Sequence, residues 1–307
     1  MPKAEFRSYY GRPVLKPPVW EWKIPAYLFT GGLAAGSALL AAGADLTGRP
    51  ALRRAGRLGS FGALLVSLVL LVADLGRPER FHHMLRVAKP TSPMSIGTWI
   101  LTAFGPGSAA AAVAELVPER WLPRTRWPGR ALTLAARPAG LSAAAVAPGV
   151  ASYTAALLSQ TAVPAWNEAR RELPFVFTGS AAASGAALGL LAAPVSEAGP
   201  ARRLALVGAA GELAAARLID RNRALPARAY TTGRAHQLRR WSELLTAGGA
   251  VLAVTLARRS RPAAAVAGLA LLGGSALQRF GVFEAGVAST KDPKYVVVPQ
   301  RERAGAE

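Results

Sequence analysis

The chain has 307 residues, of which 51% are hydrophobic and 18% are charged, and its formal net charge is +20. The excess of arginine does not indicate nucleic-acid binding, because the basic residues occupy short segments between apolar runs, as in membrane proteins. The absence of cysteine excludes a cysteine-ligated iron–sulfur cluster, a c-type haem and a thiolate nucleophile within this chain. The three histidines, His82, His83 and His236, lie in charged connecting stretches, so neither a b-type haem nor a metal site is expected.

Long runs without charge divide the sequence and exclude an ordinary soluble domain. They are 24–44, 58–73, 90–114, 138–167, 173–196 and 262–278. A helix of roughly 20 apolar residues crosses about 30 Å of hydrocarbon, and these runs have that scale. Two more polar segments, 202–220 and 241–257, bring the count to eight. Because lipid admits only helices or closed barrels, the sequence predicts an all-α polytopic membrane protein with about eight transmembrane helices in two four-helix bundles.

The chain order suggests four parts. Residues 1–23 form a polar arm with aromatic residues suited to the headgroup level, and they show no signal-peptide pattern. Residues 24–159 form the first bundle, with helices predicted over 24–44, 57–74, 94–116 and 138–159. Residues 160–281 form the second bundle, with helices predicted over 173–194, 202–220, 241–257 and 262–280. Residues 282–307 are predicted to be an irregular C-terminal tail.

The two bundles carry a weak internal repeat. Phe29-Thr30-Gly31 in the first helix matches Phe177-Thr178-Gly179 in the fifth, and small residues follow both. Both helices enter from the same side of the membrane, so the pattern favours two four-helix units in parallel repeat. The abundance of alanine leaves chance similarity open.

The distribution of basic residues gives nearly equal support to the two possible membrane orientations. We call the side of the N-terminus side A, and eight spans place the C-terminus there too. Lysine and arginine are more numerous on side A but denser in the shorter loops of side B. Since the positive-inside rule counts short loops, the sequence alone leans towards side B as the inner side.

Polar and aromatic residues converge on side A of the first bundle. Tyr27 lies about one turn inside the first helix, Asp74 ends the second, Trp99 begins the third and Tyr153 lies about two turns from the end of the fourth. A charged loop over 74–93, containing His82, would cover them. Phenol and imidazole groups can hydrogen-bond the carbonyls of a lipophilic ring, and aromatic walls can hold it. The alternatives are membrane-belt anchors for the aromatic residues and a capping or ion-pair role for Asp74.

Acidic residues mark the second bundle. Glu212 lies near the middle of its predicted helix, Asp220 lies near the end, and Glu243 falls in the first turn of the next helix. A carboxylate inside a membrane helix is costly and is a functional candidate by default. Both a proton path and a structural pair with arginine remain open.

Several motifs carry a family resemblance. Residues 74–81 (DLGRPERF) and 89–99 (KPTSPMSIGTW) resemble the hallmark of the NrfD/polysulfide reductase membrane-subunit family. Residues 31–36 (GGLAAG), Tyr153-Thr154 and the segments 163–166 (VPAW) and 173–174 (LP) fit the same pattern. So do Arg279, Ala285-Gly286 and Asp292-Pro293 near the end of the chain. The resemblance therefore spans nearly the whole chain.

The resemblance implies a subunit that is not catalytic alone. It implies that a quinone, either menaquinone or ubiquinone, binds in the first bundle, with Tyr153 as the quinone tyrosine. It also implies a four-cluster ferredoxin-like iron–sulfur partner and a molybdopterin catalytic subunit, with no haem or cluster in this chain. The partner is expected to dock on side A, against Arg77, Glu79, Arg80 and Arg86. The family's Asn and His in the first helix correspond here to Ile24 and Tyr27.

The expected function is quinone-linked electron exchange in a respiratory complex of the inner (plasma) membrane. In the family both termini face outwards, and protons would leave through Asp74 or His82. Two other classes stay open: a proton, ion or solute transporter, for which the parallel repeats and Glu212 argue, and a purely structural anchor. Quinone chemistry that drives proton pumping through Glu212 is a fourth possibility.

Overall fold

A computed structural model describes residues 14–118, 120–121, 123 and 125–304, so the arm predicted over 1–23 falls partly outside the described residues. Every regular element in the described part of the chain is a helix, which confirms the all-α prediction. The long helices are α1 (Lys23–Leu46), α2 (Pro50–Ala73), α3 (Pro93–Leu116), α4 (Trp127–Ser159), α6 (Leu173–Ala192), α7 (Gly199–Arg221), α8 (Gly233–Val254) and α9 (Arg261–Lys291). The shorter ones are η1 (Pro78–Leu85), α5 (Pro164–Glu168), η2 (Leu225–Thr231), η3 (Leu256–Arg258) and α10 (Lys294–Ala304).

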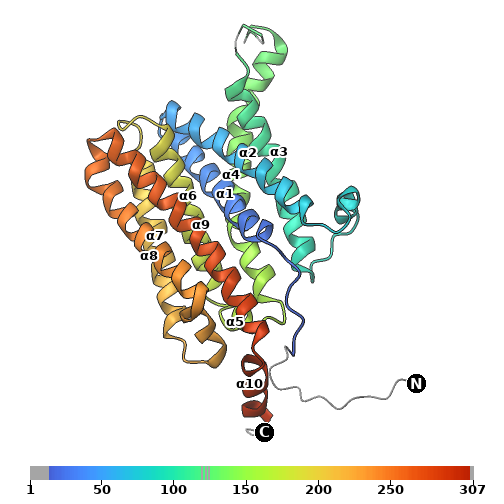
Figure 1. Ribbon diagram of the computed structural model, residues 1–307. Coiled ribbons are helices and arrows are strands. Elements are labelled where there is room, and N and C mark those ends of the chain that lie inside the picture. The colour runs from blue at the N-terminus through green and yellow to red at the C-terminus, as the bar shows by residue number, and fades with distance from the viewer. Residues whose placement is uncertain (1–13, 119, 122, 124, 305–307) are drawn as a thin grey trace.

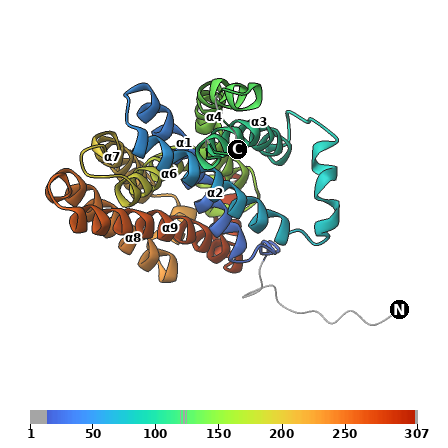
Figure 2. The same ribbon diagram turned by 90° about the horizontal axis from the view of Figure 1, so that it is seen from above.

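The long helices form two bundles of four. Helices α1 to α4 make bundle 1, and helices α6 to α9 make bundle 2. The bundles meet along α1 and α6, which pack against each other over much of their length (Figures 1 and 2). Side A is the lower end of the molecule in Figure 1, where α10 lies, and side B is the upper end.

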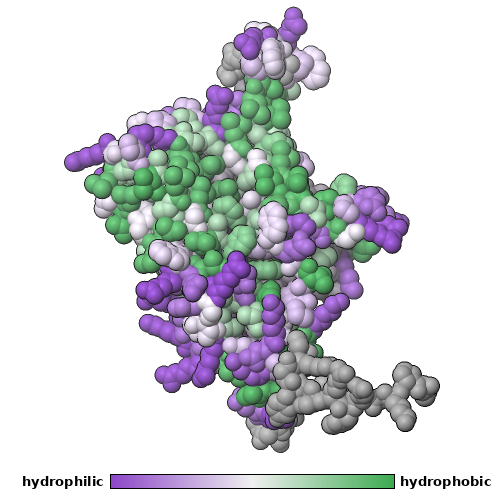
Figure 3. All heavy atoms as spheres, viewed as in Figure 1, coloured by the Kyte–Doolittle hydropathy of each residue, from purple (hydrophilic) through white to green (hydrophobic). Residues whose placement is uncertain are grey.

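Six of the eight predicted spans are confirmed by length and composition. Helices α1, α2, α3, α4, α6 and α9 are long and apolar enough to cross a membrane. Helices α7 and α8 also form and complete bundle 2, but they carry more charged residues and are not among the helices of that class. Figure 3 shows the apolar side chains gathered over the upper part of the bundles and hydrophilic ones over the lower end of bundle 2. The chain is therefore a multi-pass membrane protein.

Helix α2 begins seven residues before its predicted start. Its first turn is capped from bundle 2, since the Glu197 carboxylate accepts hydrogen bonds from the backbone N–H groups of Ala51 (2.8 Å) and Leu52 (3.1 Å). A carboxylate at a helix N-terminus satisfies unpaired donors and complements the helix dipole. The capping residue lies far away in the sequence, so a local pattern could not reveal it.

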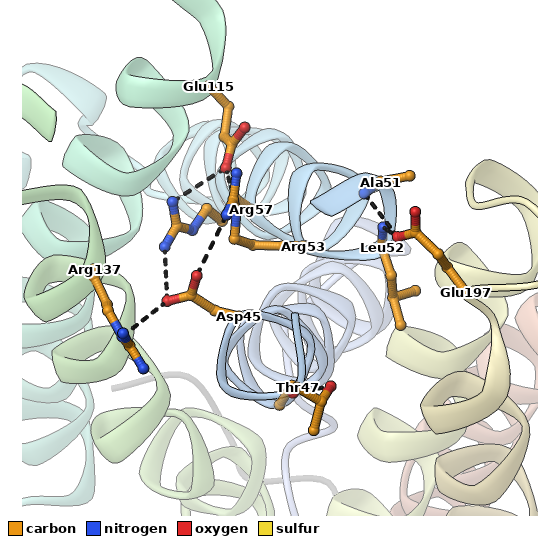
Figure 4. A network of polar contacts seen from close by, with 10 residues as sticks. Asp45, Thr47, Ala51, Leu52, Arg53, Arg57, Glu115, Arg137 and Glu197 are labelled. Atoms are coloured by element: carbon orange, nitrogen blue, oxygen red, sulfur yellow. Dashed lines mark hydrogen bonds and ion pairs between the residues drawn. The ribbon is translucent and has the colours of Figure 1, made fainter. Parts of the chain in front are cut away.

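An ion network at side B also holds the first turns of α2 (Figure 4). Asp45 at the end of α1 contacts Arg53 and Arg57 at 3.4 Å each. Glu115 in α3 contacts the same two guanidinium groups at 2.8 and 3.1 Å, and Arg137 in α4 reaches Asp45 at 3.6 Å. All four helices of bundle 1 therefore contribute to one charged cluster. The pairing allows three arginines to lie in or beside segments that are otherwise apolar.

We expect Glu115→Gln to destabilise the protein by about 3–5 kcal/mol, because it leaves the nearly buried Arg57 short of countercharge. Arg137→Gln is the matched control. Its side chain is 61% exposed whereas that of Arg57 is 6% exposed, so a loss of no more than about 1 kcal/mol is expected. Thermal unfolding of the two purified variants measures the difference. Equal stabilities would contradict a structural role for the network.

The end of the chain is more ordered than its composition suggests. The irregular tail predicted from residue 282 is wrong, because α9 continues to Lys291 and α10 follows. Val282 and Phe283 are buried, and the Trp166 indole N–H donates to the Val282 carbonyl at 2.8 Å. These contacts with α5 hold the extra turns of α9. Helix α4 likewise starts at Trp127 rather than at residue 138, and its first turns project beyond bundle 1 (Figure 1).

The bundle interface depends on two glycines. A Cβ atom at Gly36 in α1 would overlap the backbone of Ala181 in α6, and one at Gly185 in α6 would overlap the backbone of Gly36. Without side chains at this crossing, the two backbones approach as closely as small-residue interfaces in membranes allow. At the matching positions of the two bundles, Gly31 faces Ser67 of α2 and Gly179 faces the backbone of Glu212 in α7.

Candidate functional site

Two tyrosines pair inside bundle 1 near side A. Tyr27 comes from the first turns of α1 and Tyr153 from the last turns of α4, and both are buried. Their hydroxyl groups are hydrogen-bonded to each other. The ring of Tyr153 lies against Gly97 in α3, where a Cβ atom would overlap it. Three helices thus fix the orientation of one phenol.

A cavity of about 200 Å³ lies beside Tyr153. It is formed by the segment that enters α3 and by the end of α4, and its lining residues are Pro90, Thr91, Pro93, Ile96, Tyr153, Ala156 and Gln160. Its walls are mostly apolar, and Tyr153, Thr91 and Gln160 supply hydrogen-bonding groups. This volume is smaller than that of most ligand pockets, so it suits one ring head group better than a whole lipophilic molecule.

The residues of the cavity fit the chemistry of a quinone ring. The ring carbonyls of a quinone accept hydrogen bonds, and a phenol, an amide and an aliphatic hydroxyl can donate them. The apolar proline, isoleucine and alanine side chains suit the rest of the ring. The donor set and the walls therefore match the group that the sequence predicts.

Asp74 lies at the side A end of bundle 1, outside the lining of the cavity. It follows the last residue of α2 and stands close to Lys23 and Glu21 at the start of α1. Burial raises the pKa of the Asp74 carboxyl above its ordinary value, although the Lys23 ammonium opposes the shift. The carboxyl is therefore partly buried at the side A end of α1 and α2.

Two predicted contacts are not formed. Trp99 is 41% exposed, and its indole N–H donates to the Val87 carbonyl at 3.4 Å. Since each residue advances about 100° around a helix, Trp99 points away from the face on which Gly97 meets Tyr153. His82 is exposed in η1 and packs edge-on against His83, with ring centroids 4.4 Å apart. Neither residue lines the cavity.

The charged loop lies beside bundle 1 instead of over it. Figures 1 and 2 show η1 displaced to the flank of α3, and the charged side chains in it and at its two ends, Arg77, Glu79, Arg80 and Arg86, are exposed. The expectation that 74–93 forms a lid is wrong for most of the loop. Only its last residues, including Pro90 and Thr91, contribute to the cavity. The physical reason is that the charged middle of the loop gains more from solvent than from an apolar mouth.

The cavity contains residues that the sequence analysis did not select. Gln160 and Ala156 follow Tyr153 at spacings of seven and three, which place all three on one face of α4. That spacing was a usable signal for Gln160. Thr91 and Ile96 had no comparable signal, because their contribution depends on how the chain enters α3.

The three acids of bundle 2 lie in a different place. Glu212 in α7 is 2% exposed and interacts electrostatically with Arg279 in α9. Asp220 and Glu243 both pair with Arg239 in α8, at 2.6 and 3.8 Å. Glu243 is in the third turn of α8, not the first as expected, because α8 begins at Gly233.

These acids are separated from the tyrosine pair by α1. Gly31 of α1 faces Ser67 in bundle 1, whereas the adjacent Gly32 faces the guanidinium of Arg279 in bundle 2. The predicted proton-path residues and the predicted quinone residues therefore belong to two sites that meet different faces of one helix.

Comparison with known proteins identifies the family. The family described as polysulphide reductase, NrfD, matches residues 14–205, which is more than half of the chain. The match includes the helices that form the tyrosine pair and the adjoining cavity. A search of the curated proteins finds no match. With its helical membrane fold, the chain belongs to the NrfD polysulphide reductase family of membrane subunits.

Proposed function

We propose that this chain is the quinone-reactive membrane subunit of an oxidoreductase complex. The observation that carries the proposal is the buried Tyr27–Tyr153 pair, which opens through Tyr153 onto a small cavity with apolar and hydrogen-bonding walls near side A. A bound quinol or quinone supplies two-electron, two-proton redox chemistry that no side chain of this cysteine-free chain provides. Menaquinone and ubiquinone both have a ring that suits the donor set.

Tyr153 is the residue proposed to hold a ring carbonyl. Its hydroxyl is fixed by the hydroxyl of Tyr27, and its ring is fixed by Gly97, so little reorganisation is needed when a ligand binds. Tyr27 acts through Tyr153, because it does not line the cavity itself. Thr91 and Gln160 add hydrogen-bonding groups at the mouth.

Protons would leave towards side A. Asp74 is partly buried at the ends of α1 and α2, and burial raises the pKa of its carboxyl, which moves it towards a range useful for proton exchange. His82 is too far out on η1 to line the cavity, so it would act at the surface if it takes part.

The proposed partner is a four-cluster ferredoxin-like iron–sulfur subunit, with a molybdopterin subunit beyond it. Membership of the family supports this kind of complex. The proposed contact surface on side A is the set of exposed charges in η1 and at its ends: Arg77, Glu79, Arg80 and Arg86. Side A would then be the outer face of the inner (plasma) membrane.

Photolabelling of the purified full chain tests the proposal. We expect a photoreactive azidoquinone to attach within residues 90–96 and 153–160, and an excess of unlabelled quinone to suppress the attachment. Peptide mapping by mass spectrometry locates the label. Trp99→Ala is the control and should leave the labelling unchanged, since Trp99 lies on the outer side of α3. Labelling elsewhere, or labelling without competition, would instead favour an anchor or a transporter.

A further inference from the structure

Bundle 2 concentrates buried polar atoms that have no hydrogen-bond partner. In the described part of the chain eight buried side-chain atoms lack one, and six of these belong to bundle 2. The six are Ser180 Oγ, Glu212 Oε2, Arg239 Nη2, Thr246 Oγ1, Gln278 Oε1 and Arg279 Nη1. Each such atom costs about 1–3 kcal/mol unless water satisfies it, and water at such sites typically makes about three hydrogen bonds. Their clustering makes bundle 2 the part of the described chain in which buried water is most expected.

Glu212 and Arg279 form the centre of this polar region. Arg279 is 1% exposed, donates from Nη2 to the Phe177 carbonyl at 2.7 Å and stacks 3.7 Å above the Phe177 ring. Its second terminal nitrogen, Nη1, has no hydrogen-bond partner among the described residues. The Ser242 hydroxyl and the Glu243 carboxyl of α8 also interact electrostatically with the Glu212 carboxyl. The carboxyl can therefore lose its proton beside a fixed positive charge.

A charged route connects this centre to side A. Glu243 lies one turn from Arg239 in α8, and Arg239 donates to Asp220 at the end of α7 at 2.6 Å. Asp220 and Glu243 are about one-third exposed, whereas Arg239 is almost fully buried. The three residues thus lead from the buried centre to the surface at which α7 ends and α8 begins.

The other half of bundle 2 is closed. On each of the four helices, the buried residues towards side B are small or aliphatic, and they pack into one apolar cluster. This alanine–leucine plug comprises Ala183, Ala186, Ala187, Leu190, Ala201, Ala205, Ala209, Ala250, Ala253, Ala267 and Leu271. No charged or amide side chain is buried in that half among the described residues. An apolar interior of this kind stays dry.

We propose that Glu212 is a proton-exchange site that communicates with side A alone through a hydrated half-channel in bundle 2. In this step the carboxyl O–H bond breaks, the carboxylate keeps the electron pair beside Arg279, and the proton passes to water on side A. The reverse step reloads Glu212 from the same side. The charged groups around Glu212 are Arg279 and Glu243, with Arg239 and Asp220 further along the route. The inference does not depend on quinone binding.

The natural absence of cysteine allows a direct test of sidedness. Gln278 and Leu271 lie seven residues apart on one face of α9. Replacing either residue by cysteine shortens its side chain, which leaves room for a thiol reagent. The full chain, reconstituted in vesicles of known orientation, is treated from one side with a charged, membrane-impermeant methanethiosulfonate. We expect modification of the Gln278→Cys variant from side A only, and no modification of the Leu271→Cys variant from either side.

Three outcomes would overturn the half-channel. The Gln278→Cys variant could react from side B, it could fail to react from side A, or the Leu271→Cys variant could react equally well.

Infrared difference spectra of the purified chain between acidic and basic pH test the protonation of Glu212 independently. The band of a buried carboxylic acid should disappear in Glu212→Gln and persist in the matched variant Glu243→Gln. Persistence of that band in Glu212→Gln would overturn the assignment even if the accessibility pattern held.

Discussion

Tyr153→Phe is expected to lower quinone-dependent turnover of the assembled complex by roughly 10- to 100-fold, which corresponds to the loss of one oriented hydrogen-bond donor. The substitution removes a single oxygen atom. The ring keeps its place against Gly97, so the fold should tolerate the change. Turnover with excess quinol, measured on complexes of matched composition, gives the effect.

Companion variants separate the role of the hydroxyl from that of the fold. Tyr27→Phe should have a smaller effect, because Tyr27 only orients Tyr153 and does not line the cavity. Trp99→Phe should have almost none, since that indole lies outside the site. Unchanged turnover in Tyr153→Phe, with normal assembly, would remove the tyrosine pair from the proposed mechanism.

Gly36→Ala adds one methyl group and is expected to be among the most destabilising glycine-to-alanine substitutions in this chain. The added Cβ would overlap the backbone of Ala181, and a backbone cannot rotate away as a side chain can. Forced overpacking costs about 1–3 kcal/mol and occasionally more, and here it would push the two bundles apart. Thermal unfolding in detergent and the yield of monodisperse protein measure the loss.

Gly43→Ala is the control for this prediction. Gly43 belongs to the same helix, and a Cβ atom there meets nothing within 4 Å. The change from glycine to alanine in a helix interior should then stabilise the protein slightly, by about 0.5–1 kcal/mol. Similar losses in both variants would show that the effect comes from α1 itself and not from the contact with Gly185.

The fold was largely predictable, because hydrophobic length is a local property of the sequence. Each of the six charge-free runs became a helix long and apolar enough to cross a membrane. The boundaries were less predictable where distant residues decide them. Glu197 caps the start of α2, and the contacts of Val282 and Phe283 extend α9, yet both effects join segments more than one hundred residues apart.

The candidate site was predictable only in part. Family motifs pointed to Tyr153, and the threading of helices correctly placed Tyr27 near it. The same threading placed Trp99 and His82 beside these tyrosines, whereas neither lines the cavity, since counting spans gives depth but not the rotation of a helix or the path of a loop. Gln160 was missed although its spacing from Tyr153 places both on one face.

The sequence by itself determined a membrane protein of this family, because apolar runs and a contiguous charged motif are readable one segment at a time. It also identified Glu212 as a costly acid in a helix. Only the tertiary structure decided that Glu212 meets Arg279 in bundle 2 while Tyr27 meets Tyr153 in bundle 1, on the two faces of α1. Such pairings depend on helix rotation and close glycine crossings, which arise when all the helices pack together.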